Sequence, residues 1–380
     1  MKRRNNTIIY ICVILITLLL LSMLSIYATA SFKTSGFSKK ISARAAALYE
    51  PSNDTFLYTK NGNERMPMAS TTKIMTAIIA AENCDMDEIV IIGPESVGIE
   101  GSSAYLREGD EYTVLELTYA LLLQSANDAA TALAYYVAGG IEEFSNLMNE
   151  KAESLKLQNT HFTNPHGLDD NEHYTTATEL AKIGAHLLKN ELLAEIVSTY
   201  KKTFTYGERT RTYINHNKLL LSFGDANGIK TGFTKRCGRC LVGSAMRDGI
   251  QLICVTLDAP SDWNDQKAMM EYGFDILECV QICEQGDFAE QIAVLDGAQD
   301  RISVSAKENM QIVKEKGESI TNKSINIPSY LIAPINDGDT VGNVVFEFGD
   351  KTYTVDIVAN ESVPRASRNN IFTKIKKIFR

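Results

Sequence analysis

The chain has too few cysteines for a disulfide framework, since seven thiols are scattered over 380 residues. One pair, Cys237-Gly-Arg-Cys240, has a spacing found in metal sites. A zinc site would need two further ligands, and no second Cys-x-x-Cys pair occurs in the sequence. A local disulfide is an alternative if the protein is exported, and buried free thiols are the default expectation. The sequence therefore implies no metal or organic cofactor.

Positive charge is also scarce, because 38 lysines and arginines face 47 aspartates and glutamates, which gives a net charge of −9. A nucleic-acid partner is disfavoured for the body of the protein, since binding to phosphates needs a basic surface. The basic residues gather at the two ends, at Lys2-Arg3-Arg4 and in residues 365–380, which contain no acidic residue. The middle of the chain is therefore more acidic than the total suggests.

Both ends of the chain have features of membrane-directed segments. Residues 1–30 combine a basic start with a long apolar run and end in Ala28-Thr-Ala30, which has the form of a signal-peptidase site. We expect a signal peptide cleaved after Ala30, with an uncleaved anchor as the alternative. In either case the body of the protein would lie outside the cytoplasm, at the outer face of the cytoplasmic membrane or in the cell-wall space.

Residues 365–380 predict a basic amphipathic helix. Apolar side chains recur on one helix face, and lysines and arginines occupy the rest. Such a helix suits an anionic membrane surface. The alternatives are a solvated terminal helix or a disordered tail.

The order of the predicted elements indicates an α+β catalytic domain over residues 31–285. A hairpin with a turn at residues 51–54 is followed by helices, then by strands and a last helix. Residues 157–176 are polar and rich in turn residues, so we expect a loop there. The predicted helices cover residues 70–83, 113–123, 126–138, 141–156, 177–189 and 264–278. The predicted strands cover 202–206, 239–246 and 250–257.

The pattern of predicted secondary structure changes near residue 286. Short strand patterns separated by turn signals continue to residue 362, interrupted by one possible short helix near 307–316. This pattern predicts a separate small β-sandwich over residues 286–362.

Three short motifs in a fixed order suggest a catalytic serine. Ser70-x-x-Lys73 lies where a helical pattern begins, Ser125-x-Asn127 lies between two apolar helical runs, and Lys230-Thr231-Gly232 lies on a predicted edge strand. Each motif alone is weak; Ser198 and Lys201 repeat the first spacing, and Ser70 could simply be a helix N-cap. Lys-Thr-Gly, however, occurs once, and the order and spacing of the three suit the active site of penicillin-recognising enzymes.

The chemistry explains the choice of residue types. A serine hydroxyl is a weak nucleophile until a base takes its proton. A lysine can be that base only when it is neutral, and burial or a neighbouring cation lowers its pKa.

On these motifs the chain resembles the low-molecular-mass penicillin-binding proteins of the serine-type D-alanyl-D-alanine carboxypeptidase family. The stretches MASTTKIMTA, LLLQSANDAATALA, FTNPHGLDD and NGIKTGFT carry the resemblance, which covers nearly the whole mature chain. It implies an α+β transpeptidase domain like that of penicillin-binding proteins and β-lactamases, followed by the all-β module. It also implies peptidoglycan stem peptides as substrates and β-lactam antibiotics as covalent inhibitors.

The resemblance assigns a role to each motif residue. Ser70 would be the nucleophile, Lys73 the general base and Ser125 the group that protonates the leaving D-alanine. Asn127 would hold the substrate amide and Lys73. Lys230 and Thr231 would bind the terminal carboxylate, and Gly232 would let the acyl peptide approach the strand. The backbone N–H groups of Ser70 and Phe233 would form the oxyanion hole.

Two positions differ from some relatives, and three other functions are alternatives to the carboxypeptidase. Some relatives carry His at Phe233 and Arg at His216. A β-lactamase is disfavoured because residues 157–176 lack a Glu-x-x-x-Asn motif. A D,D-endopeptidase would share every catalytic residue. A catalytically silent cell-wall-binding protein would not need all three motifs intact. His161, His166 and His173 lack a tight metal-ligand spacing.

Overall fold

The structure, a computed structural model, describes residues 36–206 and 209–366. The predicted signal segment 1–30 lies outside the described residues, as do residues 367–380 of the predicted amphipathic helix. Within the described part of the chain, no helix has the length and apolar content needed to cross a membrane.

The first domain is built on a five-stranded antiparallel sheet with the order β2-β1-β9-β8-β7. Its strands are β1 (Ala45–Glu50), β2 (Thr55–Lys60), β7 (Ala226–Thr234), β8 (Gly238–Arg247) and β9 (Ile250–Leu257). The predicted hairpin is confirmed, with its turn at residues 51–54. Strand β7, which carries Lys230-Thr231-Gly232, is an edge strand, as predicted.

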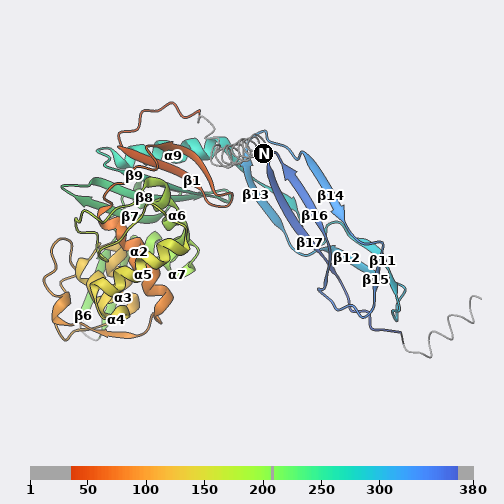
Figure 1. Ribbon diagram of the computed structural model, residues 1–380, viewed down its shortest axis with the longest axis horizontal. Helices are drawn as coiled ribbons and strands as arrows, with labels where there is room; N and C mark the ends of the chain where they lie inside the picture. The colour runs from red at the N-terminus through yellow and green to blue at the C-terminus, as the bar shows by residue number, and fades with distance from the viewer. Residues whose placement is uncertain (1–35, 207–208, 367–380) are drawn as a thin grey trace, which may run out of the picture.

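Helices cover both faces of this sheet (Figure 1). They are α2 (Lys73–Asn83), α3 (Val114–Leu123), α4 (Asn127–Ala138), α5 (Ile141–Ser154), α6 (Ala177–Leu188), α7 (Glu191–Ser198), α8 (Leu219–Ser222) and α9 (Asp262–Ile276), with the 3-10 helices η1 (Ala69–Thr72) and η2 (Pro94–Ser96). The six predicted helices are confirmed with ends that shift by up to three residues. The prediction missed α7, α8 and the short strands β3 (Ile89–Ile91), β4 (Glu111–Thr113) and β6 (Arg209–Ile214), which pairs with β5 (Lys201–Tyr206).

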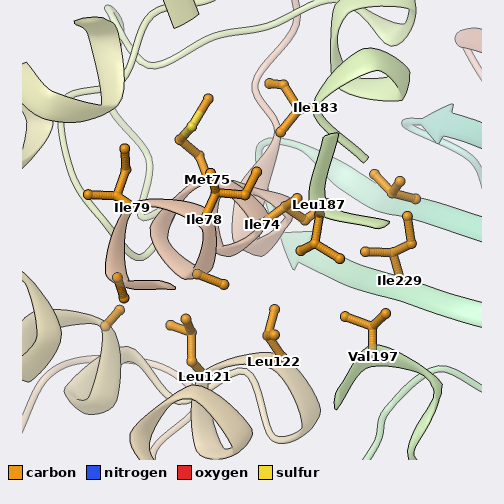
Figure 2. Packing of buried hydrophobic residues seen from close by; sticks show 14 of the residues in the cluster. Ile74, Met75, Ile78, Ile79, Leu121, Leu122, Ile183, Leu187, Val197 and Ile229 are labelled. Atoms are coloured by element: carbon orange, nitrogen blue, oxygen red, sulfur yellow. The ribbon is translucent and has the colours of Figure 1, made fainter. Parts of the chain in front are cut away.

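Two hydrophobic clusters lie on opposite faces of the sheet. Helix α6 packs on β1 and β9 from one side, together with the helical lobe, and α9 packs on β8 and β9 from the other. Helix α2 runs through the larger cluster, where Ile74 and Ile78 meet side chains of α3, α6 and β7 (Figure 2). The apolar spacing of α2 therefore buries this helix and fixes the serine turn that precedes it.

The C-terminal part is all-β, as predicted. A six-stranded sheet with the order β14-β16-β17-β12-β11-β15 packs with the β10-β13 pair around one hydrophobic core. The strands are β10 (Leu277–Cys283), β11 (Glu290–Leu295), β12 (Arg301–Ala306), β13 (Met310–Glu315), β14 (Asn322–Asn326), β15 (Tyr330–Ile332), β16 (Thr340–Phe348) and β17 (Lys351–Ala359).

The possible short helix near residues 307–316 is wrong, because residues 310–315 form strand β13. The alternation there buries Ile312 and Val313 against β10 and the two cores, and this pairing outweighs the weak helical pattern. The domain division predicted at residue 286 stays a prediction, and β10, which precedes it, pairs with β13.

Candidate active site

Ser70 lies in the 3-10 turn η1, directly before α2. The alternative that Ser70 is the N-cap of the helix is wrong, because Thr72 occupies that position and no side chain caps it. A 3-10 turn places residues three apart on one face. Accordingly, Lys73 Nζ donates a hydrogen bond to Ser70 Oγ at 3.1 Å. The serine hydroxyl therefore faces a base rather than the helix backbone.

Lys73 is completely buried, and its Nζ lies within hydrogen-bond distance of three oxygens. Besides Ser70, Nζ donates to Asn127 Oδ1 at 2.6 Å and to the His166 carbonyl at 2.5 Å. Burial, followed by the positive charge of Lys230, lowers the pKa of Lys73 well below its usual range, and the Asp128 carboxylate acts in the opposite direction. The site therefore disfavours the charged amine. Once neutral, Nζ keeps two donors for Asn127 and the His166 carbonyl, and its lone pair can accept the Ser70 proton.

Ser125 lies in the connection between α3 and α4, and Asn127 is the first residue of α4. Ser125 adopts a left-handed backbone conformation with φ of 61° and is buried. The Asn127 side chain connects two parts of the site, because its oxygen accepts from Lys73 and its nitrogen donates to the Glu100 carbonyl. Both bonds fix the amide in one orientation.

The third motif lies on edge strand β7. Lys230 is 1% exposed, and its Nζ donates to the Thr231 carbonyl at 2.9 Å. Burial lowers the pKa of Lys230 to about 7. A Cβ added to Gly232 would lie 3.1 Å from the backbone nitrogen of Ser70, so the strand passes directly beside the serine turn.

A pocket of about 300 Å³ opens above these groups. Its lining includes Ser70, Ser102, Ser125, His216, Lys218, Thr231, Gly232, Phe233, Arg239, Cys240, Asp262 and Trp263. Five of the predicted site residues therefore line one pocket, while Lys73, Asn127 and Lys230 lie buried next to it. The structure thus brings together all three motifs.

Several residues that hold the site were missed by the sequence analysis. The Asp128 carboxylate is buried and accepts hydrogen bonds from Ser103 Oγ and from the N–H groups of Ala104 and Leu106. It fixes the segment whose Glu100 carbonyl holds Asn127. An aspartate directly after Ser125-x-Asn127, at the start of an apolar helix, was the only available signal.

The segment 157–176 is a loop, as predicted, and it closes the back of the site. His173 accepts from the Thr163 N–H through Nδ1, so its Nε2 carries the proton and donates to Thr72 Oγ1. Burial lowers the pKa of His166 to about 3 and that of His173 to about 4, which keeps both rings neutral. Within the residues that the structure describes, no three potential ligands are arranged to hold a metal ion.

The Cys237 and Cys240 thiols are both buried and unpaired. Burial raises the pKa of Cys237 to about 11 and that of Cys240 to about 12, so both stay protonated. Cys237 Sγ donates to Asp169 Oδ1 at 3.3 Å, which links the β7–β8 turn to the loop.

An antiparallel sheet flanked by helices, with a serine beside a buried lysine, defines a serine hydrolase with the transpeptidase fold of penicillin-binding proteins and β-lactamases. Comparisons with known proteins give the family. A model described as D-alanyl-D-alanine carboxypeptidase matches residues 31–261, and one described as the C-terminal domain of penicillin-binding protein 5 matches residues 278–365. The chain belongs to the D-alanyl-D-alanine carboxypeptidase family.

Relatives match over most of their length. The chain is 31% identical to the D-alanyl-D-alanine carboxypeptidase DacF of Bacillus subtilis, with 93% of this chain and 95% of the relative covered. It is 32% identical to DacC of Escherichia coli over 82% of each chain.

Solved structures agree with this assignment. Penicillin-binding protein 5 of Haemophilus influenzae has a TM-score of 0.65 at 27% identity, covering 86% of this chain and 99% of that one. A peptidoglycan synthesis regulatory factor (PBP3) of Streptococcus pneumoniae has a TM-score of 0.73 at 25% identity, with 86% and 100% covered. The chain is therefore a serine peptidase of the penicillin-binding class, and the endopeptidase and the silent wall-binding protein are not favoured.

Proposed function

We propose that this carboxypeptidase removes the terminal D-alanine from peptidoglycan stem pentapeptides through an acyl-enzyme on Ser70. The observation that carries the proposal is the contact of 3.1 Å between Lys73 Nζ and Ser70 Oγ in a site that disfavours the charged amine. A neutral amine at that distance can take the hydroxyl proton as the oxygen attacks.

The first half of the reaction forms an ester. Ser70 Oγ attacks the carbonyl carbon of the penultimate D-alanine while its proton passes to Lys73. The backbone N–H groups of Ser70 and Phe233 stabilise the oxyanion that appears in the transition state. The C–N bond then breaks, and Ser125 passes the proton to the departing amine. Water later hydrolyses the ester and frees Ser70.

The strand residues position the substrate for this attack. Thr231 and Lys230 act on the terminal carboxylate, while Asn127 holds the substrate amide and keeps Lys73 in place. The missing side chain of Gly232 supports close passage of the acyl peptide, since even a methyl group would touch the turn that carries Ser70. β-Lactams carry a carboxylate and a reactive amide, so they would acylate the same serine.

Release of D-alanine tests this proposal. Purified full-length protein in detergent and its Ser70→Ala variant are incubated with a peptide ending in Lys-D-Ala-D-Ala, with and without penicillin. We expect release by the parent, none by the variant and none after penicillin. Covalent uptake of penicillin without release would shift the function to the endopeptidase, and the absence of both would refute the serine mechanism.

We also propose that the protein is exported and held at the membrane by residues 365–380. The sequence of both ends supports this, and so does the position of Ala366. Ala366 N donates to the Asp296 carbonyl beside β11, which lies at the end of the C-terminal domain far from the catalytic domain (Figure 1). The C-terminal domain would then act as a spacer that sets the height of the active site above the membrane.

Sedimentation with vesicles tests the membrane proposal. The full chain should bind anionic phosphatidylglycerol vesicles more tightly than neutral phosphatidylcholine vesicles, and a chain that ends at residue 364 should lose this preference. Equal binding of the two chains to anionic vesicles would contradict the role of the C-terminal segment.

A further inference from the structure

The active-site pocket contains an arginine that none of the three motifs includes. Arg239 lies on β8 and lines the pocket together with Ser70 and Thr231. Its side chain is 43% exposed, so it is accessible to a ligand in the pocket.

The register of the sheet places this arginine on a definite face. Arg239 is the antiparallel partner of Phe233, and side chains of directly opposed residues point to the same face. Phe233 and Thr231 are two residues apart and share that face, whereas Lys230 and Gly232 belong to the other. The guanidinium and the Thr231 hydroxyl are therefore on one side of the edge strand.

Arg239 is held in place by two residues at the start of α9. Its Nη2 donates to the Asp262 carboxylate at 2.9 Å, and its guanidinium carbon lies 5.6 Å from the centre of the Trp263 ring. Asp262 is buried and also accepts from the Trp263 N–H. The positive end of this helix offsets part of the aspartate charge, so the pair retains attraction for an anion.

The other positive groups at the pocket do not supply a planar pair of donors for a carboxylate. Lys230 is 1% exposed and its Nζ already donates to the Thr231 carbonyl, so it acts on the carboxylate through its charge. Burial and the Lys230 charge lower the pKa of His216, which makes it neutral at neutral pH. Lys218 is exposed at the rim of the pocket, and an ammonium is a point charge without the planar fork of a guanidinium. A guanidinium offers a planar pair of donors that matches a carboxylate. Arg239 lines the pocket, and the bond to Asp262 uses only its Nη2.

We propose that Arg239 is a specificity-determining residue, which binds the terminal carboxylate of the substrate together with the Thr231 hydroxyl. This inference rests on the proposed carboxypeptidase function and adds the group that selects a free C-terminus. Asp262 is a positioning residue, since it acts only through the arginine.

Two peptides that differ in one group test the role of Arg239. The full-length enzyme is given an acyl-Lys-D-Ala-D-Ala peptide with a free carboxylate and the same peptide with a C-terminal carboxamide. In Arg239→Gln, kcat/KM for the carboxylate peptide should fall about 10- to 100-fold, the range for a charge-assisted hydrogen bond, while the carboxamide peptide changes less than about twofold. Arg239→Lys should recover part of the loss.

Matched variants separate this role from a structural one. Arg236→Gln removes an exposed arginine from the turn between β7 and β8 and should leave the ratio of the two kcat/KM values unchanged. Lys218→Gln tests the rival cation. The proposal is overturned if Arg239→Gln loses activity equally on both peptides, or if its ratio of the two kcat/KM values equals that of the parent. It is also overturned if that ratio falls in Lys218→Gln instead.

A second readout separates failure of this inference from failure of the proposed function. The rate of acylation by benzylpenicillin is compared with that by its methyl ester, which lacks the carboxylate. If the parent cleaves neither peptide but is acylated, the carboxypeptidase proposal fails, and the inference stands only if Arg239→Gln selectively slows benzylpenicillin. If neither cleavage nor acylation occurs in the parent, both are refuted.

Discussion

At the scale of single residues, the site depends on the two buried lysines. Lys73 and Lys230 are both removed from water, and each therefore loses part of the hydration that stabilises its charged form. The charge of Lys230 lowers the pKa of Lys73 further. Burial lowers the pKa of Lys230 to about 7, so Lys230 carries its charge mainly on the acid side. The pH dependence of acylation should therefore report on their coupling.

We predict that Lys230→Gln moves the acid limb of the acylation rate to higher pH. Acylation needs neutral Lys73, so its rate falls as pH drops through the Lys73 pKa. Removing the Lys230 charge removes one cause that lowers this pKa, so the limb should move to higher pH. The measurement is the rate of covalent labelling by a fluorescent penicillin across the pH range.

A control for the loss of charge is Lys235→Gln, in the exposed turn after β7. This variant should keep the acid limb of the parent. A limb that moves to lower pH in Lys230→Gln, or that stays in place, would contradict the electrostatic coupling of the two lysines.

At the scale of elements, the site depends on how closely β7 passes η1. A Cβ on Gly232 would lie 3.1 Å from three backbone atoms, the Met68 oxygen and the nitrogens of Ser70 and Thr71. Backbone atoms cannot rotate away as a side chain can, so the strand or the turn must shift. Such a shift would change the position of the Ser70 N–H relative to the substrate.

We predict that Gly232→Ala slows acylation by penicillin about tenfold, because small displacements of reacting groups are costly. The free energy of unfolding should fall by about 1–3 kcal/mol, as expected for overpacking. Gly224→Ala is the matched control, since nothing lies within 4 Å of its added Cβ. Acylation at the parental rate in Gly232→Ala would show that the close approach has no role in catalysis.

Elements with strong local patterns could be predicted, and elements defined by distant partners could not. The apolar spacing of α2 and the turn residues of the first hairpin are local signals, and both structures are confirmed. Strands β3 and β4 have three residues each and pair across about twenty residues, so no local period marks them. The helical pattern near residues 307–316 misled because β10 provides the partner of β13.

The same distinction applies to the site. Ser70 and Lys73 are three residues apart, so their contact could be inferred from the turn geometry. The bond from Lys73 to the His166 carbonyl spans 93 residues and uses a backbone atom, which no residue type specifies. Arg239 was missed because its place beside Thr231 follows from the register of β7 and β8 rather than from a motif.

At the scale of the whole molecule, one asparagine side chain joins the two domains. Asn53 lies in the turn between β1 and β2, and its Nδ2 donates to the Val313 carbonyl of β13 at 2.8 Å. The Tyr353 hydroxyl of β17 donates to Asn53 Oδ1 at 2.6 Å. The buried carboxylate of Glu50 accepts from the backbone and side-chain nitrogens of Asn53 and holds the turn. These contacts couple the C-terminal domain to the hairpin of the catalytic sheet.

We predict that Asn53→Ala uncouples the unfolding of the two domains while D-alanine release from a soluble peptide stays at the parental level. Two hydrogen bonds between the domains are lost, each contributing about 1 kcal/mol, so the C-terminal domain should unfold at a lower temperature in a calorimetric scan. Tyr353→Phe removes one of the two bonds and should produce a smaller shift.

Tyr330→Phe is the control, because it changes an exposed tyrosine of the same domain and should leave the scan unchanged. A parental scan in Asn53→Ala would mean that other contacts fix the domains, and a parallel loss of peptide cleavage would mean that the turn supports the catalytic sheet itself.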